Sequence, residues 1–176
     1  MRKVIVLCVF LSFAAFINAQ IKRNFDGLIL GKTTRTEVLN HIRKKGFYPE
    51  DIDGGKAVLA KGDISFGGVV WDGVAYYFYN DVLSLVVYTK YSRNREAERM
   101  ELDKVYYKLR NNLLKKYTNY KTPSSNASVP NNLFLKGKDA TVEVKRMTKN
   151  RSYYVKLIYT DTVLKKKTLI KEYDDL

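Results

Sequence analysis

Apolar residues recur at helical spacing soon after the start of the chain. An apolar stripe runs from Val38 to Ile42, and Thr34 with Glu37 three residues later has the spacing of a capping box. Gly46 follows the stripe and can adopt the left-handed conformation that ends many helices. The pattern therefore predicts a helix over residues 35–45.

A second, longer stripe predicts a helix over residues 94–117. Acidic residues gather in its first half and basic residues in its second half, which complements the helix dipole. We interpret these charges as a solvated face. The apolar stripe comprises Leu102, Val105, Tyr106, Leu109, Leu113 and Tyr117.

Elsewhere the pattern changes to short runs of β-branched and aromatic residues, which are typical of strands. Residues suited to tight turns separate the runs at 61–63, 72–73, 80–81 and 149–150. A Pro-, Ser- and Asn-rich loop over 121–132 divides the two groups of runs. The predicted strands cover residues 56–60, 65–71, 74–79, 83–90, 133–137, 140–147 and 152–160.

The order of elements is helix then strands, twice, which is typical of the α+β class. We expect a single domain over residues 20–176, made of tandem repeats at about 25–91 and 94–160 with a C-terminal tail. In this arrangement both helices pack on one face of an antiparallel sheet, since each helix has one apolar stripe to bury.

The first nineteen residues have the organisation of a secretory signal peptide. Arg2 and Lys3 precede an apolar stretch that ends at Phe16, which is too short to cross a bilayer, and Ala19 stands at the cleavage position. Cys8, the single cysteine, lies inside this stretch, so the mature chain is expected to have no disulfide or cysteine-based site. We therefore expect a secreted or periplasmic protein without a transmembrane segment.

The formal net charge of the chain is +14, and it is +12 once Arg2 and Lys3 are removed. Between Lys136 and Lys171, eleven basic residues stand against three acidic ones, a local net charge of +8. A positive field of this kind favours anionic glycans, lipid head groups or acidic protein faces, and we expect no nucleic acid partner. The alternative is that the basic exterior only keeps the protein in solution.

The segment GLILGKTT at residues 27–34 has the glycine, lysine and threonine of a phosphate-binding loop. Only three residues separate Gly27 from Gly31, however, whereas a phosphate loop needs four to wrap its backbone around the anion. We interpret the segment as a buried lead into the first helix and expect no cofactor.

Catalytic chemistry has few candidates in this sequence. His41 is the single histidine, and the sequence identifies neither a nucleophile nor an orienting carboxylate for it. With one histidine and no cysteine after cleavage, a zinc site is not expected. We therefore expect a non-enzyme with no catalytic, cofactor-binding or metal-ligating residues, and a hydrolase using paired carboxylates is the alternative from another class.

Tyrosines provide the remaining candidates, since the chain has fourteen and many lie in predicted strands. Alternate strand positions face opposite sides of a sheet, and here the helix-free side carries tyrosines where polar residues are usual. Tyr, Trp and Arg dominate interface energetics, so this face predicts a recognition surface. The alternative is that the tail, the 121–132 loop or a second copy of the chain covers it. The predicted surface comprises Trp71, Tyr77, Tyr79, Tyr88, Lys145, Tyr154 and Lys156.

The segment GKTTRTEVLNHIRKKGF followed by WDGVAYYFYNDVLSLVVY resembles small envelope proteins of the SmpA/OmlA kind and the β-lactamase-inhibitor-protein fold. The resemblance rests on Gly31, Thr34, Glu37, Val38 and Gly46, and it implies a capped helix followed by an antiparallel meander, a unit that the inhibitor contains twice. The inhibitors have disulfides and the SmpA/OmlA proteins are lipoproteins. This chain lacks both features, so neither function is implied, and its style is similar to secreted proteins of Bacteroides-type bacteria.

Taken together, these features predict an exported, non-enzymatic protein-binding module of the bacterial envelope. Its partner and oligomeric state are not defined by the sequence. The alternative function is binding of anionic glycans or lipid head groups through the basic C-terminal half.

Overall fold

The structure, a computed structural model, describes residues 21–93, 96–118 and 131–167. The predicted signal peptide and nearly all of the predicted 121–132 loop lie outside the described residues. The predicted tail is described only as far as residue 167.

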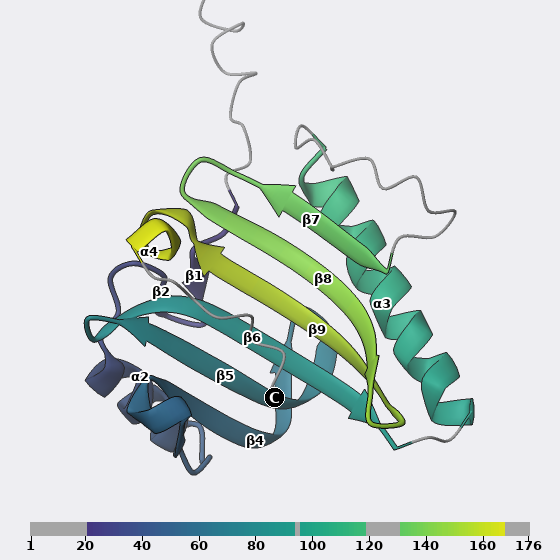
Figure 1. Ribbon diagram of the computed structural model, residues 1–176, viewed down its shortest axis with the longest axis horizontal. Coiled ribbons are helices and arrows are strands. Elements are labelled where there is room, and N and C mark those ends of the chain that lie inside the picture. The colour runs from purple at the N-terminus through teal and green to yellow at the C-terminus, as the bar shows by residue number, and fades with distance from the viewer. Residues whose placement is uncertain (1–20, 94–95, 119–130, 168–176) are drawn as a thin grey trace, which may run out of the picture.

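The described strands form a seven-stranded antiparallel sheet in the order β3-β4-β5-β6-β9-β8-β7, together with a small hairpin of β1 and β2 (Figure 1). The sheet accounts for most of the described fold, so the predicted α+β class with an antiparallel sheet is confirmed. The strands are β1 (Asn24–Phe25), β2 (Leu28–Ile29), β3 (Glu50–Ile52), β4 (Ala57–Phe66), β5 (Val69–Tyr79), β6 (Val82–Ser92), β7 (Asn132–Lys136), β8 (Ala140–Lys149) and β9 (Ser152–Asp161).

Strands β6 and β9 join the two groups of strands. They pair in one continuous register from Leu85 opposite Thr160 to Ser92 opposite Tyr153. Strands that precede and follow the long helix in sequence therefore belong to the same sheet.

Three described helices accompany the sheet: α2 (Arg35–Lys44), α3 (Glu96–Lys116) and α4 (Thr162–Lys167), and a short 3₁₀ turn, η2 (Asp53–Gly55), precedes β4. The Thr34 hydroxyl accepts from the Glu37 amide, and the Glu37 carboxylate accepts from the Thr34 amide at 2.7 Å. The predicted capping box is therefore confirmed, as is the left-handed stop at Gly46, whose φ is 82°.

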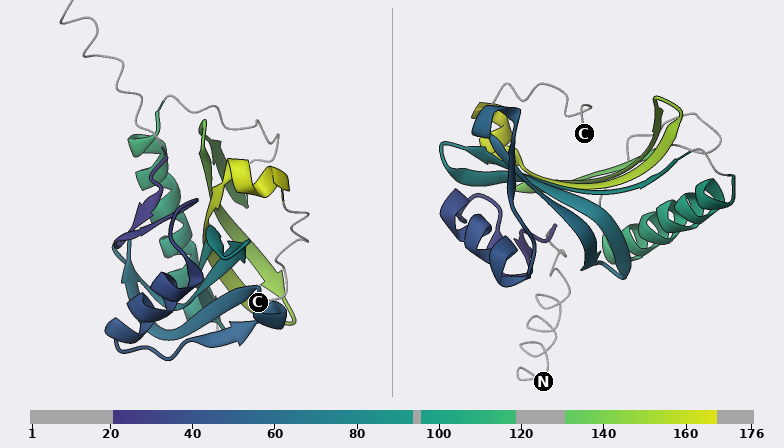
Figure 2. Two further views of the ribbon diagram at one scale, coloured as in Figure 1. Left: turned by 90° about the vertical axis from the view of Figure 1, so that its left-hand side faces the viewer. Right: turned by 90° about the horizontal axis from the view of Figure 1, so that it is seen from below.

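Helices α2 and α3 lie on one side of the sheet and α4 lies on the other (Figure 2). Side chains from both long helices enter a single large core with alternate residues of the strands. The Asp103 carboxylate of α3 also accepts from the Arg146 guanidinium of β8 at 2.6 Å. We call the opposite side, which carries α4, the second face.

A smaller apolar cluster lies on the second face. All of its fully buried members come from strands β4, β5 and β6. We call it the second-face cluster, and it comprises Ala57, Ala75, Tyr77, Leu85 and Val87.

A β-bulge changes which residues of β6 face the helices. The register passes from Tyr77 opposite Leu85 to Phe78 opposite Leu83, so Ser84 is an extra residue, and its hydroxyl donates to the Tyr77 carbonyl at 3.1 Å. An extra residue inverts the alternation on the rest of the strand. Tyr88 consequently enters the main core at 3% exposure, and its predicted placement on the helix-free face was wrong.

The turns predicted at 61–63 and 72–73 were also wrong. These residues form a second irregularity inside the β4–β5 pair, and the two strands instead connect through Gly67 and Gly68, with φ values of 64° and 73°. Trp71 is therefore inside strand β5 and fully buried, so its predicted place on a recognition surface was wrong. Its indole N–H donates to a backbone carbonyl at 3.0 Å, which satisfies its polar atom in the core.

The remaining turns follow their predictions more closely. Asn80 and Asp81 form the predicted hairpin turn, with φ values of 47° and 65°. The turn predicted at 149–150 is displaced by one residue to Asn150 and Arg151, which have φ values of 48° and 62°.

Substitution of Tyr88 tests the inverted alternation. The Tyr88 ring stacks on Phe66 at a centroid distance of 4.4 Å, whereas Tyr91 of the same strand is 44% exposed on the second face. We expect Tyr88→Ala to lower the free energy of unfolding by about 3–5 kcal/mol, as for other large core truncations, and Tyr91→Ala by less than about 1 kcal/mol. Chemical denaturation measures both values, and equal losses would contradict this assignment of faces.

Candidate functional site

The glycine-containing segment before α2 uses its backbone amides within the fold. The Gly31 amide donates to the Leu83 carbonyl at 2.8 Å, and the amides of Lys32 and Thr33 donate to the Ile29 carbonyl at 3.1 and 2.9 Å. A phosphate loop must instead point several amides at the anion. The segment therefore anchors the start of α2 to β6 and does not form a phosphate cradle.

A groove of about 870 Å³ crosses the second face at the end of the sheet where β6 leads toward α3. Small residues such as Gly73 and Ala75 line it together with the rings of Tyr91 and Tyr154, whose centroids lie 6.3 Å apart. We call it the tyrosine groove. Exposed aromatic rings beside small residues are suited to holding an apolar group of a partner.

Strand register and local irregularity together produce this groove. Tyr91 and Tyr154 are directly opposite each other in the β6–β9 pair, so both rings project from the same face. Gly62 and Gly73, at the irregularity of the β4–β5 pair, line the groove without side chains. A Cβ atom at Gly73 would lie 3.3 Å from the Ala60 carbonyl oxygen, which is a tight contact.

Charged groups of both signs surround the tyrosine groove, and several are held by hydrogen bonds. The Asp72 carboxylate accepts from the Tyr91 amide at 2.7 Å, and the Glu98 carboxylate accepts from the Ser92 hydroxyl at 2.9 Å. Lys61, at the β4 side, donates to a carboxylate of β3 at 2.7 Å. These bonds stabilise the rim of the groove, which carries both positive and negative charges.

Within residues 21–93, 96–118 and 131–167, no three His, Cys, Asp or Glu side chains are placed to hold a metal ion. No helix within those residues has the length and apolar character needed to cross a membrane.

The structure brings together three of the residues predicted for a recognition surface. Lys145 and Lys156 are directly opposite each other in the β8–β9 pair, and Tyr154 shares their face one alternate position away on β9. Lys145 and Tyr154 are half-buried, whereas Lys156 is only 2% exposed. Tyr154 is the one of the three that lines the groove.

The other predicted residues are placed differently. Tyr77 is on the second face but only 4% exposed, and Tyr79 is half-buried beside the turn after β5. Trp71 and Tyr88 lie in the main core on the opposite side of the sheet. Sequence reasoning missed Tyr91, since its position in the alternation depends on the bulge earlier in β6.

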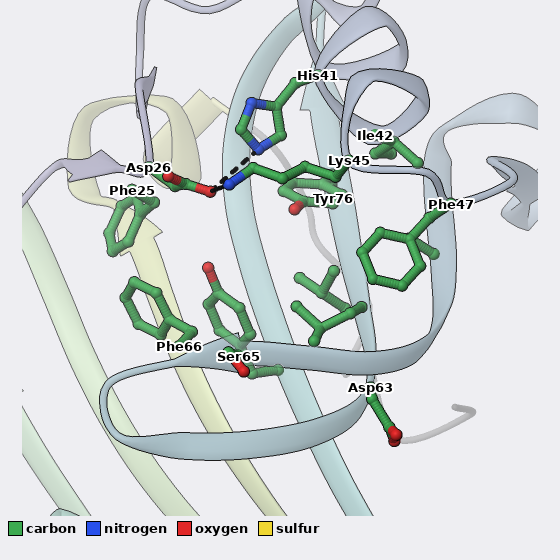
Figure 3. A pocket seen from close by; sticks show the side chains of 14 residues that line it. Phe25, Asp26, His41, Ile42, Lys45, Phe47, Asp63, Ser65, Phe66 and Tyr76 are labelled. Atoms are coloured by element: carbon green, nitrogen blue, oxygen red, sulfur yellow. Dashed lines mark ion pairs between the residues drawn. The ribbon is translucent and has the colours of Figure 1, made fainter.

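A second site is an aromatic cavity of about 240 Å³ between α2, the β1–β2 hairpin and strands β4 to β6 (Figure 3). Phenylalanine and tyrosine rings supply much of its lining. At its edge, the Asp26 carboxylate lies 2.7 Å from the Lys45 ammonium and 3.5 Å from Nε2 of His41. Figure 3 shows Ser65 on the far side of the cavity from His41, so this serine is not beside the histidine as a nucleophile.

Burial and the Asp26–Lys45 ion pair shift the pKa values of several groups that line this cavity. The hydrogen bond from Lys45 lowers the pKa of Asp26, and burial lowers the pKa of His41 against the opposing effect of the Asp26 charge. Burial also raises the pKa of Tyr76 and Tyr88, so both hydroxyls stay protonated. The tyrosine hydroxyls that line the cavity are therefore neutral.

Comparisons with known protein families, curated proteins and solved structures found no match for this chain.

The single histidine allows a direct test of the cavity electrostatics. NMR titration of His41 should give a pKa below 6.5, and Asp26→Asn should lower it further because the carboxylate no longer stabilises the charged ring. Because the folded-state pKa is depressed, the unfolded chain binds this proton more tightly, and the free energy of unfolding falls as pH decreases below 6.5. Asp63→Asn, at another part of the lining, is the matched control and should leave the pKa unchanged. An increase in the His41 pKa on Asp26→Asn would contradict the assigned ion pair.

Proposed function

We propose that the protein is an exported, non-enzymatic protein-binding module that holds an extended segment of a protein partner in the tyrosine groove. The observation that carries the proposal is the pair of rings of Tyr91 and Tyr154 on an open part of the sheet. Tyrosine rings bury a large contact area at low conformational cost and are frequent interface hot spots.

The surroundings of the groove favour a protein segment over a uniformly charged ligand. Its lining carries Lys61 and Arg93 as well as Asp63, Asp72 and Glu98, so a partner with both apolar and mixed polar groups is complementary to it. Its volume is in the range that shaped binding sites commonly have. In support of a non-enzymatic role, the single histidine of the chain, His41, lines the aromatic cavity and not the tyrosine groove.

We further propose that the chain is a tandem duplication of a helix-then-meander unit. In support, α2 precedes strands β3 to β6 and α3 precedes strands β7 to β9, and the two sets meet at the β6–β9 pair. The resemblance to the β-lactamase-inhibitor-protein fold suggests the same arrangement, and the signal-like start of the sequence supports the exported location.

Site-specific photo-crosslinking tests the groove as the binding site. A benzophenone amino acid at position 91 or 154 should give a discrete protein adduct in the envelope fraction of the source cells. The same probe at Tyr107, a 39% exposed tyrosine of α3, is the matched control and should not.

Alanine substitution quantifies the same interaction. The double variant Tyr91→Ala/Tyr154→Ala should reduce capture of that adduct partner by at least about tenfold, as expected for central aromatic residues of an interface. Its melting temperature should stay close to that of the native protein. Adducts of equal yield at position 107, or undiminished capture by the double variant, would overturn the proposal.

Binding of anionic glycans or lipid head groups is the second candidate function. The observation that favours it is the direct opposition of Lys145 and Lys156, which places two positive charges side by side on the second face. By contrast, Arg146 is directed to α3 and bonded to Asp103, so the basic half does not act as one patch.

Heparin chromatography tests this candidate. Lys145→Glu/Lys149→Glu should elute at clearly lower salt than Lys104→Glu/Lys115→Glu, a variant of equal net charge whose changes lie on α3. Elution of the two variants at the same salt concentration would show that heparin binding depends only on the net charge of the protein, and would reject a dedicated anion site.

A further inference from the structure

The aromatic cavity beside α2 has room for a molecule larger than water. Its volume is about 240 Å³, whereas one water molecule occupies about 30 Å³ in the liquid and an apolar cavity of about 150 Å³ takes up benzene. The cavity therefore has space for a single aromatic ring with a short substituent. It belongs to the helix side of the sheet, since Phe25, Tyr76 and Tyr88 of its lining are members of the main core.

Aromatic rings from distant segments form walls of this cavity and hold one another in place (Figure 3). The Phe66 ring of β4 stacks on Tyr88 of β6 at a centroid distance of 4.4 Å, and it lies 6.0 Å from the Phe25 ring of β1. The Tyr88 ring also contacts Trp71 in the main core, at 5.7 Å. Rings fixed in this way form a site before a ligand binds, which lowers the entropic cost of binding.

Two buried tyrosine hydroxyls supply the polar part of the cavity. Tyr76 and Tyr88 line it and are 6% and 3% exposed, and burial keeps both hydroxyls protonated by raising their pKa. Neither hydroxyl forms a hydrogen bond with the part of the chain that the structure describes. Buried polar groups of proteins nearly always have a partner. A ligand that fits the cavity should therefore present an acceptor to these hydroxyls.

The charges around the cavity favour an uncharged ligand. At its edge, the Asp26 carboxylate and the Lys45 ammonium already pair at 2.7 Å, and burial lowers the pKa of His41, which favours the neutral ring. Asp63, the remaining charged residue of the lining, directs its carboxylate away from the rings in Figure 3. An ion in the cavity would lose its hydration without gaining a free counter-charge.

We propose that the aromatic cavity is a binding site for a small, uncharged aromatic carbonyl compound. The ring of the ligand packs between Phe25 and Phe66 on one side and the aliphatic side chain of Ile42 on the other, and its carbonyl oxygen accepts from Tyr76 and Tyr88. A carbonyl oxygen suits this site because its two lone pairs can accept from both hydroxyls. The site is independent of the tyrosine groove, so the outcome at one does not decide the other.

Titration of the native protein with acetophenone, followed by NMR, tests the site directly. This molecule has one aromatic ring and one carbonyl group. We expect saturable shifts of the signals of His41, Ile42 and Val74, which line the cavity, with a dissociation constant of about 1 mM or lower. Signals of Tyr91 and Tyr154 are the internal reference and should not shift. Absence of saturable shifts at the cavity, or equal shifts in the groove, would overturn the proposal.

Removal of the hydroxyl groups tests the hydrogen bonds. Ethylbenzene has nearly the shape of acetophenone and lacks the acceptor, so the ratio of the two affinities isolates the contribution of the carbonyl group. Tyr76→Phe/Tyr88→Phe should lower the preference for acetophenone by about fivefold or more. Tyr159→Phe is the matched control, because this buried ring lies 4.4 Å from Phe25 without lining the cavity, and it should leave the ratio unchanged. An unchanged ratio in the double variant would overturn the assigned donors.

Filling the cavity tests where the molecule binds. Ala60 lines the aromatic cavity, whereas Ala75 lies on the second face and lines the tyrosine groove. Ala60→Leu should weaken acetophenone binding by at least about tenfold, because the added atoms occupy the site, and Ala75→Leu should not. Undiminished binding by a folded Ala60→Leu variant would overturn the proposal. If melting curves show that either variant does not fold, the ratio measured with Tyr76→Phe/Tyr88→Phe decides the proposal.

Benzoate tests the charge of the ligand. It is an anion of nearly the same size as acetophenone, and Lys45 is already paired with Asp26. Benzoate should therefore bind the native protein at least about tenfold more weakly than acetophenone does. Equal or tighter binding of benzoate in the same titration would overturn the assignment of an uncharged ligand.

Discussion

The antiparallel pairing of β6 with β9 is the interaction on which the rest of the structure depends. It joins strands that are about seventy positions apart in sequence into one sheet, with Tyr91 opposite Tyr154 and Thr89 opposite Lys156. Without this pairing each half would expose a strand edge, and a sheet edge of this length readily pairs with other chains. The tyrosine groove exists because the pairing places one ring from each half side by side.

The two long helices on one side contribute to a large main core, and a smaller apolar cluster lies on the second face. Burying the apolar stripes of α2 and α3 stabilises the fold through the usual hydrophobic gain. The second face also carries apolar residues, and the burial of Tyr77 and Val87 shows that this surface is withdrawn from water. The second face therefore combines a buried apolar cluster with the tyrosine groove beside it.

Part of the candidate site could be predicted from the sequence. Alternation along β8 and β9 correctly places Lys145, Tyr154 and Lys156 on one face, because both strands are regular there. The same reasoning placed Tyr88 wrongly, since one extra residue in β6 inverts every later position. Tyr91 was missed for this reason, and a bulge at a serine has no periodicity signal that identifies it in a single sequence.

The sequence by itself determined the features that depend on neighbouring residues: the capping box at Thr34, the helix stop at Gly46, the hairpin turn at Asn80 and the class of the fold. Their energies are local, so they are the same wherever the segment lies. Tertiary structure alone decided strand order, bulge positions, the Asp26–His41 contact and the burial of Lys156. Each of these depends on contacts between distant segments, and such contacts leave no spacing pattern along the chain.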